Sequence, residues 1–239
     1  MLDLASRLRD LPERGDGPPW PDYEYAKGWG VFALPFASGH VLALRVFPEN
    51  AFSPYRSLWH RDPQRRWSIH VDGQHLDTAC PRYFGPACAH VGHARIRLEW
   101  TGSASLRVTV DEPELDWTLT ARQTPILRLM NVISPRMPLS TWRSPRLIQA
   151  REIMAQRALG LGQVRMSGTM PSGHEGILMP ERMYFIDEAA AVLDGINLGA
   201  VTRVNPNPDI GGIPLPARGV LAIGQGAWQI PHNKGAQHD

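Results

Sequence analysis

Long apolar runs and cysteines are scarce in this sequence. No apolar stretch approaches the ~18 residues that a membrane-spanning helix needs, so we expect no integral membrane segment. Residues 1–16 mix acidic and basic side chains and have no apolar core, which is not typical of a secretory signal. The two cysteines, Cys80 and Cys88, fit a reducing compartment, because an oxidising one would favour a bond between cysteines so close in sequence. A cytoplasmic location is the resulting expectation.

An excess of charge of one sign is also missing. The formal net charge is +2, from 25 basic and 23 acidic residues, and the two signs alternate along the expected strands. A nucleic-acid groove needs basic side chains gathered on one surface, so the sequence predicts no nucleic-acid partner. Phosphate-binding glycine loops, the H-E-x-x-H zinc motif and the G-x-S-x-G turn are absent from the sequence. We therefore expect no cofactor.

Turn-forming residues, by contrast, are plentiful. The chain has 22 glycines and 22 prolines among 239 residues, enough to separate the many short strands of a barrel or sandwich. This length suits one β-rich domain with a sizeable core, or two very small ones. The composition therefore favours a mainly β protein.

The strongest β pattern covers residues 94–121 and predicts a three-stranded meander. Apolar and polar side chains alternate along each strand, the period of a half-buried strand. The expected turns place Trp100 opposite Leu106 and Val110 opposite Leu115. One face of the meander is then wholly apolar.

A second hairpin is predicted for residues 55–72. Its turn, Asp62-Pro63-Gln64-Arg65, has the residues of a type I turn. If Asp62 pairs with Arg65, one face is apolar except for Arg56 and His60. The members of that face are Arg56, Leu58, His60, Trp67, Ile69 and Val71. The other face includes Tyr55, Trp59, His70 and Asp72, and the sequence does not decide which face lines a cavity.

A helical pair interrupts the strands. Thr124-Pro125 and Ser144-Pro145 have the residue types of helix starts, and Gly160 follows the second helix. Apolar residues recur at intervals of three and four between these signals. They are Ile126, Leu129, Met130 and Ile133 in the first helix and Leu147, Ala150, Met154, Ala158 and Leu161 in the second.

Roughly ten strands and one helical pair favour a single antiparallel lipocalin-like β-barrel, because closing a sheet removes its exposed edges. We assign residues 1–27 to an N-terminal arm and residues 28–230 to the barrel domain. The helical insertion covers about 125–161, and residues 231–239 form a flexible tail.

A family resemblance supports the barrel. The run RLEWTGSASLRVTVDEPELDW, residues 97–117, resembles a segment of the carotenoid 1,2-hydratase (hydroxyneurosporene synthase) and AttH-like group. In that group a W-x-G turn leads into a strand that ends in Asp-Glu. The resemblance implies a lipocalin-like unit that holds a large apolar molecule, and the carotenoid members add water to a double bond without an organic cofactor. No catalytic residue of the group matches a position here.

His60 and Arg56 are the candidate catalytic residues. A histidine on an apolar barrel face can act as general acid or base, because its pKa lies near neutral pH and burial can tune it. An arginine inside the barrel can bind a carboxylate or a developing oxyanion. In the structural alternative, His60 lies at the barrel mouth and Arg56 forms an ion pair.

Seven other residues are candidate ligand-binding residues, chosen by hairpin face or by aromatic and thioether chemistry. They are Trp67, Tyr55, Trp59, His70, Tyr83, Met137 and Trp142. For the last two the alternative is a helical pair packed flat on the barrel exterior. Cys88, His90 and His93 match no usual zinc spacing, so we predict no metal site there.

Two functions remain open. The first is a cofactor-free hydratase, lyase or isomerase that acts by acid/base chemistry on a hydrophobic or aromatic small molecule. The second is a non-catalytic lipocalin-like carrier of a lipid, isoprenoid or steroid. We favour the enzyme, because ionisable residues on an apolar face are costly unless they are used or paired. A homodimer stays open, and a scaffold domain without a cavity is the third alternative.

Overall fold

The computed structural model describes residues 2–9 and 17–230. The predicted tail, 231–239, and residues 10–16 of the predicted arm lie outside the described residues. Strand β1 begins at Tyr23, within the segment predicted as an arm.

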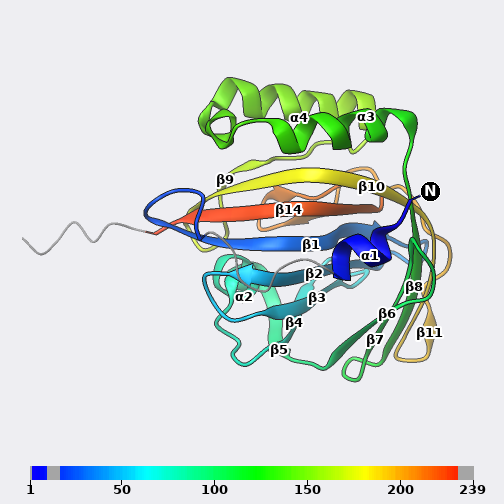
Figure 1. Cartoon of the computed structure of the whole chain (residues 1–239). Helices are drawn as coiled ribbons and strands as arrows, with labels where there is room; N and C mark the ends of the chain where they lie inside the picture. Colours follow the sequence, from blue (N-terminus) through cyan, green and yellow to red (C-terminus); the bar gives the residue numbers. More distant parts are fainter. Residues whose placement is uncertain (1, 10–16, 231–239) are drawn as a thin grey trace, which may run out of the picture.

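One large sheet dominates the described chain (Figure 1). Its main strands follow the spatial order β5-β4-β3-β2-β1-β14-β10-β8-β7-β6. Their bounds are β1 Tyr23–Pro35, β2 Val41–Asn50, β3 Tyr55–Arg61, β4 Trp67–Asp72, β5 Cys88–His93, β6 Ile96–Trp100, β7 Ser105–Val110, β8 Leu115–Arg122, β10 Glu175–Leu193 and β14 Val220–Gln229. The short strands are β9 Ser167–Thr169 and β11 Ile196–Asn197, which pair with β10, and β12 Asp209–Ile210 and β13 Ile213–Pro214, which pair with each other.

The chain is mainly β, as predicted, but the closed antiparallel barrel is wrong in two respects. Strand β5 runs parallel to β4, because the connection between them contains helix α2 (Ala79–Phe84) and the turn η1 (Gly85–Ala87), long enough for a crossover. The sheet also curls into a half-barrel without closing.

Side chains link the two ends of the curled sheet at one corner. Arg56 of β3 donates a hydrogen bond to the carbonyl of Ile96 in β6 (2.8 Å), and Asp72 of β4 accepts one from the Ile96 N–H (3.1 Å). Arg56 and Asp72 also form an ion pair of 3.5 Å. The backbone N–H and carbonyl of Ile96, on the edge strand β6, therefore have hydrogen-bond partners although β6 does not pair with β3 or β4 as a strand.

The meander has the predicted register. Trp100 lies opposite Leu106, and Val110 lies opposite both Ile96 and Leu115. The apolar face of these strands forms one wall of the core inside the curl.

The predicted register of the second hairpin is wrong by one residue. The Asp62 N–H donates to the carbonyl of Arg66 (3.0 Å), whereas the Asp62 carbonyl accepts from the N–H of Arg65 (2.9 Å), which adopts a left-handed conformation with φ of 68°. The type I turn is thus followed by one extra residue, a common three-residue loop. Because side chains alternate, the slip moves the β4 side chains to the opposite face, and His60 now lies opposite Ser68 rather than beside Trp67.

Three apolar clusters fill the molecule. Helix α1 (Leu4–Arg9) lies inside the curl and packs Leu4 and Leu8 against the meander and β1–β3. The other face of β1–β4 packs under α2, with Trp59 and Trp67 at its centre. Helices α3 (Pro125–Ile133) and α4 (Pro145–Leu159) cover β10 and β14 on that same side.

The helix boundaries agree with the capping signals. Helix α3 begins at Pro125, with the Thr124 hydroxyl accepting from the N–H of Leu127, and α4 ends before Gly160, which has a φ of 63°. Except for Met130 and Leu161, the apolar residues that predicted these helices do not lie on the faces that pack on the sheet. Those faces carry Leu127 and Asn131 in α3 and Ile148, Ala155 and Leu159 in α4.

Candidate functional site

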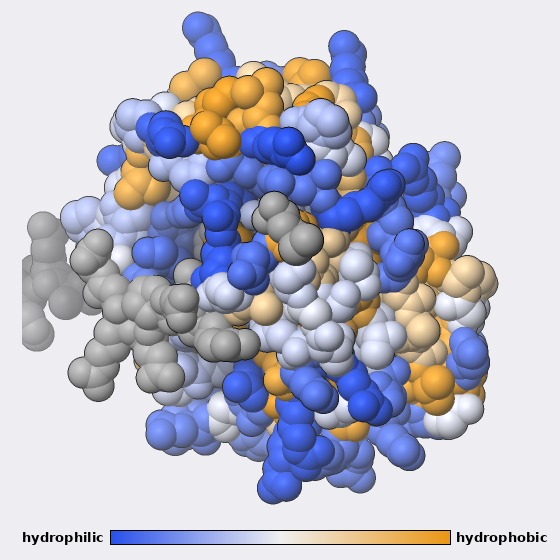
Figure 2. Space-filling model, turned by 45° about the vertical axis from the view of Figure 1, so that its right-hand side comes forward, coloured by the Kyte–Doolittle hydropathy of each residue, from blue (hydrophilic) through white to orange (hydrophobic). Residues whose placement is uncertain are grey.

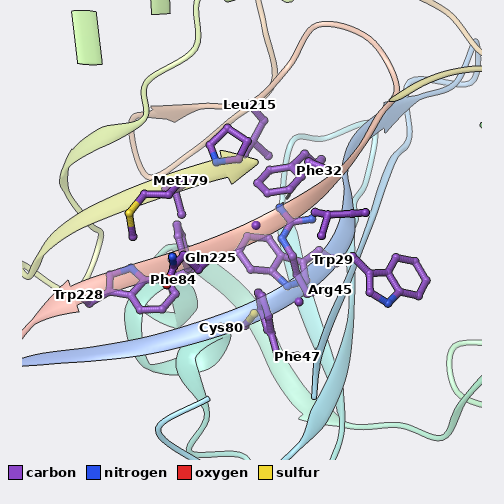
Figure 3. Close-up of a pocket in the computed structure, with 18 of the residues that line it drawn as sticks. Trp29, Phe32, Arg45, Phe47, Cys80, Phe84, Met179, Leu215, Gln225 and Trp228 are labelled. Atoms are coloured by element: carbon purple, nitrogen blue, oxygen red, sulfur yellow. Dashed lines mark hydrogen bonds between the residues drawn. The ribbon is translucent and has the colours of Figure 1, made fainter. Parts of the chain in front are cut away.

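An apolar pocket lies between the sheet and the segments that cover its outer face (Figure 3). Strands β1, β2, β10 and β14 supply its walls, and α2 and the segment after β12 close over it. The lining side chains are mostly aromatic, aliphatic or sulfur-containing. They include Phe32, Phe47, Trp59, Cys80, Phe84, Met179, Ile213, Leu215 and Trp228.

Glycines form part of this pocket because strands approach closely there. Gly28 of β1 pairs with Gly224 of β14. A Cβ on Gly28 would lie 2.0 Å from the carbonyl oxygen of Val46, and one on Gly224 would lie 2.3 Å from that of Met179. Larger residues would force the backbone apart, so the pocket wall lacks side chains at both positions.

A second narrow pocket continues from the first. Both are lined by Phe32, Leu178, Pro180, Ile213, Leu215 and Ala222. The second extends to Leu161, Val164, Arg165 and Met166, the segment that follows α4. Each has a free volume of about 60 Å³, so the space suits a slender apolar body rather than a bulky polycyclic one.

Arg45 brings a positive charge to the first pocket. It is only 6% exposed, and its guanidinium lies 4.1 Å from the centre of the Phe32 ring and 5.0 Å from that of Trp59. Nη1 donates to the carbonyls of Val31 and Leu44, and Nη2 donates to that of Phe32. These bonds reach carbonyls at a register shift of β1, between Val31 and Leu34.

The charge of Arg45 has no counter-ion in the described part of the chain. No carboxylate lies within ion-pair distance of its guanidinium there, and the ionisable groups nearest to it are Cys80 and Tyr55. Burial raises the pKa of both groups, so both are neutral at neutral pH. Burial lowers the pKa of Arg45 to about 10, which still leaves it protonated. A buried cation without a counter-ion is costly even with carbonyl and aromatic contacts, and the remaining donors, Nε and one Nη2 hydrogen, have no acceptor among the described residues.

A buried hydrogen-bond chain holds the wall next to Arg45. The Tyr55 and Ser57 hydroxyls each donate to Sγ of Cys80 at 3.3 Å, and Nε1 of Trp59 donates to the Ser57 hydroxyl at 3.1 Å. Trp59 lines the pocket, whereas Tyr55 supports Cys80 from behind. These hydrogen bonds fix the shape of a polar part of the pocket wall and add no charge to it.

His60 and His70 lie on the other face of the sheet, in a separate cleft of about 530 Å³. This histidine cleft is lined by His60, Ser68, His70, His90, Gly92, His93, Glu112 and Pro113. Nε2 of His60 lies 2.8 Å from Nδ1 of His40, so one ring donates a hydrogen bond to the other. The rings of His70 and His90 are 5.3 Å apart.

Burial lowers the pKa of His60 and of His70 to about 4. The neighbouring His40 lowers that of His60 further, and His90 acts in the same way on His70, while Asp194 opposes both effects. Both imidazoles are therefore neutral at neutral pH, with one ring nitrogen as hydrogen-bond donor and the other as acceptor.

The structure places the other predicted residues apart from both hollows. Arg56 joins the ends of the sheet and its side chain is 44% exposed. Nε1 of Trp67 donates to the carbonyl of Asp209, and Tyr83 stacks on Trp228 with ring centres 4.5 Å apart. Met137 and Trp142 contact Arg151 in the helical pair. The predicted set is thus spread over several places.

Arg45 and His40 were missed by the sequence reasoning. Arg45 interrupts HVLALRVF, a run that is apolar at alternate positions on both faces. A single charge in such a run is a usable signal, because a strand covered on both faces buries it whichever way it points. His40 precedes the same strand, and only the pairing of β2 with β3 brings it to His60.

Within residues 2–9 and 17–230, no group of three or more histidine, cysteine or acidic side chains is arranged to hold a metal ion. Comparison with known proteins adds no relative: no protein-family model, no curated protein and no solved structure matches this chain.

Proposed function

We propose that the protein binds a slender apolar carboxylic acid, with the carboxylate at Arg45 and the apolar body along the two connected pockets. This is the carrier alternative, with the ligand class narrowed to acids. The observation that carries it is the buried Arg45 guanidinium, which has no acidic partner among the described residues.

The chemistry of the pocket matches an anionic head and an apolar tail. Nε–H and Nη2–H of a guanidinium can bind both oxygens of a carboxylate, and charge-assisted bonds of this kind are strong. A bound carboxylate would also compensate the buried charge. The aromatic and aliphatic lining would take the tail, at ~25 cal/mol for each Å² removed from water.

Octanoate and its methyl ester provide a matched pair of probes, because the two share a tail and differ in charge. We expect octanoate to bind to the full chain by titration calorimetry, and methyl octanoate to bind about tenfold to a hundredfold more weakly, the range for hydrogen bonds to a charged group. Arg45→Gln keeps a donor for the β1 carbonyls and removes the charge, so it should lower the affinity for octanoate and spare that for the ester.

Arg95→Gln is the control variant, because Arg95 is exposed and lies outside both pockets. It should bind both probes like the natural chain. Thermal unfolding of Arg45→Gln checks that the variant is folded at the titration temperature. Equal affinity for acid and ester, or octanoate binding that Arg45→Gln leaves unchanged, would contradict the proposal.

A second candidate function is cofactor-free acid/base catalysis in the histidine cleft, favoured by the hydrogen-bonded His40–His60 pair. Adjacent strand residues point to opposite faces, so Trp59 faces the Arg45 pocket while His60 faces the cleft. Such an enzyme would need a substrate of its own in the cleft. Its signature is turnover that His60→Gln abolishes and Arg95→Gln leaves unchanged.

A further inference from the structure

Helices α3 and α4 present apolar stripes to the outside. Ile126, Leu129 and Ile133 follow the i, i+3, i+7 spacing along one side of α3, and Leu129 is 61% exposed. Leu147 and Met154 lie seven residues apart on α4 and are also exposed. Figure 2 shows an orange surface at the top of the molecule, where these helices lie, with blue side chains beside it.

These stripes are not needed to hold the helices on the sheet. The opposite sides of the helices carry Leu127 and Ile148, which are buried in the cluster over β10 and β14. Asn131 adds two hydrogen bonds to the backbone of Met183, at 2.8 and 2.9 Å. The outward stripes therefore form an unpartnered apolar face.

The same segment concentrates positive charge. Residues 124–165 contain seven arginines and one acidic residue, Glu152, a net charge of +6. The rest of the chain has 18 basic and 22 acidic residues, a net charge of −4, and the two parts give the total of +2. The alternation of positive and negative side chains along the expected strands does not extend to this segment.

The arginines of this segment differ from the others in their partners. Nine arginines elsewhere form ion pairs with acidic side chains. Among the described residues, none of the seven in the segment does so. They are Arg128, Arg136, Arg143, Arg146, Arg151, Arg157 and Arg165, all exposed except the half-buried Arg151. Their charge is available to an external anion.

We infer that the outward face of α3 and α4 docks on the surface of an anionic lipid bilayer. Apolar stripes would enter the headgroup boundary, and the surrounding arginines would meet lipid phosphates and carboxylates. No helix in the described ranges is long and apolar enough to cross a membrane, so the contact would be peripheral. A second copy of the chain fits this face less well, because two segments of charge +6 repel each other. The inference does not rest on the proposed ligand, since the residues that its test changes, Arg128, Leu129, Ile133 and Arg136, line neither pocket.

Vesicle co-sedimentation of the full chain tests the inference. We expect binding to phosphatidylcholine vesicles that contain one third phosphatidylserine, weaker binding at high salt, and little binding to pure phosphatidylcholine. Arg128→Gln with Arg136→Gln should lower the partition coefficient about fivefold for each arginine. Leu129→Ser with Ile133→Ser should lower it at least tenfold, because two exposed apolar side chains leave the interface.

Ile196→Ser is the matched control, since Ile196 is 58% exposed on β11, away from the helices. It should sediment with vesicles like the natural chain. Failure to bind anionic vesicles would overturn the inference, as would equal binding by Leu129→Ser with Ile133→Ser. Light scattering that shows a dimer lost in this variant, without vesicle binding, would assign the face to a second copy instead. Octanoate binding is measured without vesicles, so the two proposals can fail separately.

Discussion

The hydrogen bonds of Arg45 and its charge have different roles. Its donors satisfy carbonyls at the register shift in β1, which any hydrogen-bond donor of similar reach can do. Its charge strengthens those bonds and interacts with the rings of Phe32 and Trp59, but burial without an acidic partner still makes the charge costly. A buried charge without an acidic partner in the described chain is the reason to expect an anion from outside.

The lowered pKa values of His60 and His70 predict that the stability of the protein depends on pH. The folded-state pKa values of His60 and His70 are about 4, below the unfolded value of about 6.5, so the unfolded chain binds more protons between these limits. Their contribution to stability is therefore present above pH ~6.5 and is lost as the pH falls toward ~4. After a discount for partial solvent exposure, we expect a loss of roughly 1–3 kcal/mol from the pair.

Urea unfolding at pH 7.5 and pH 4.5 measures this loss. The double variant His60→Asn with His70→Asn should lose less stability over that interval than the natural chain, because asparagine does not titrate there. His75→Asn is the control, as His75 is exposed, and it should lose as much as the natural chain. Equal losses in the double variant and the natural chain would show that the two imidazoles are not buried in neutral form.

At the scale of elements, the two hairpins show what a pattern of alternating residues can predict. In the meander, both strands of each pair alternate strictly, so a one-residue slip would place polar side chains in the core and only one register is stable. In the β3–β4 hairpin, both faces carry aromatic residues, and the turn alone decides the register. The sequence of that turn does not show that Arg65 takes a left-handed conformation, because arginine has no preference for it.

Arg65→Gly is expected to stabilise the protein by about 1 kcal/mol, because glycine adopts a φ of 68° without strain. The ion pair of Arg65 with Asp209 (3.6 Å) is exposed and its loss costs little. Gln64→Gly in the same loop is the control, and it should lower stability because it only adds freedom to the unfolded chain. Thermal unfolding compares them. A lower Tm for Arg65→Gly than for the natural chain would mean that the turn differs from the one described.

At the scale of the whole molecule, the net charge does not show how charge is distributed along the chain. A net charge of +2 predicts no particular surface, yet the helical segment carries +6 and the rest −4.

The mainly β class and the helix positions could be predicted, because each depends on residues near in sequence. Closure of the sheet, and the pairing of His40 with His60, depend on distant segments. The pocket around Arg45 likewise needs strands β1, β2, β10 and β14 together.

The central claim is that an acid enters this pocket with its carboxylate at Arg45. A crystal structure of the full chain with 8-bromooctanoate tests it most directly, because the bromine marks the end of the tail. We predict the carboxylate within hydrogen-bond distance of the Arg45 guanidinium and the bromine on the side of Leu161, Val164 and Met166. Bromine density in the histidine cleft, or a carboxylate turned away from Arg45, would contradict the account.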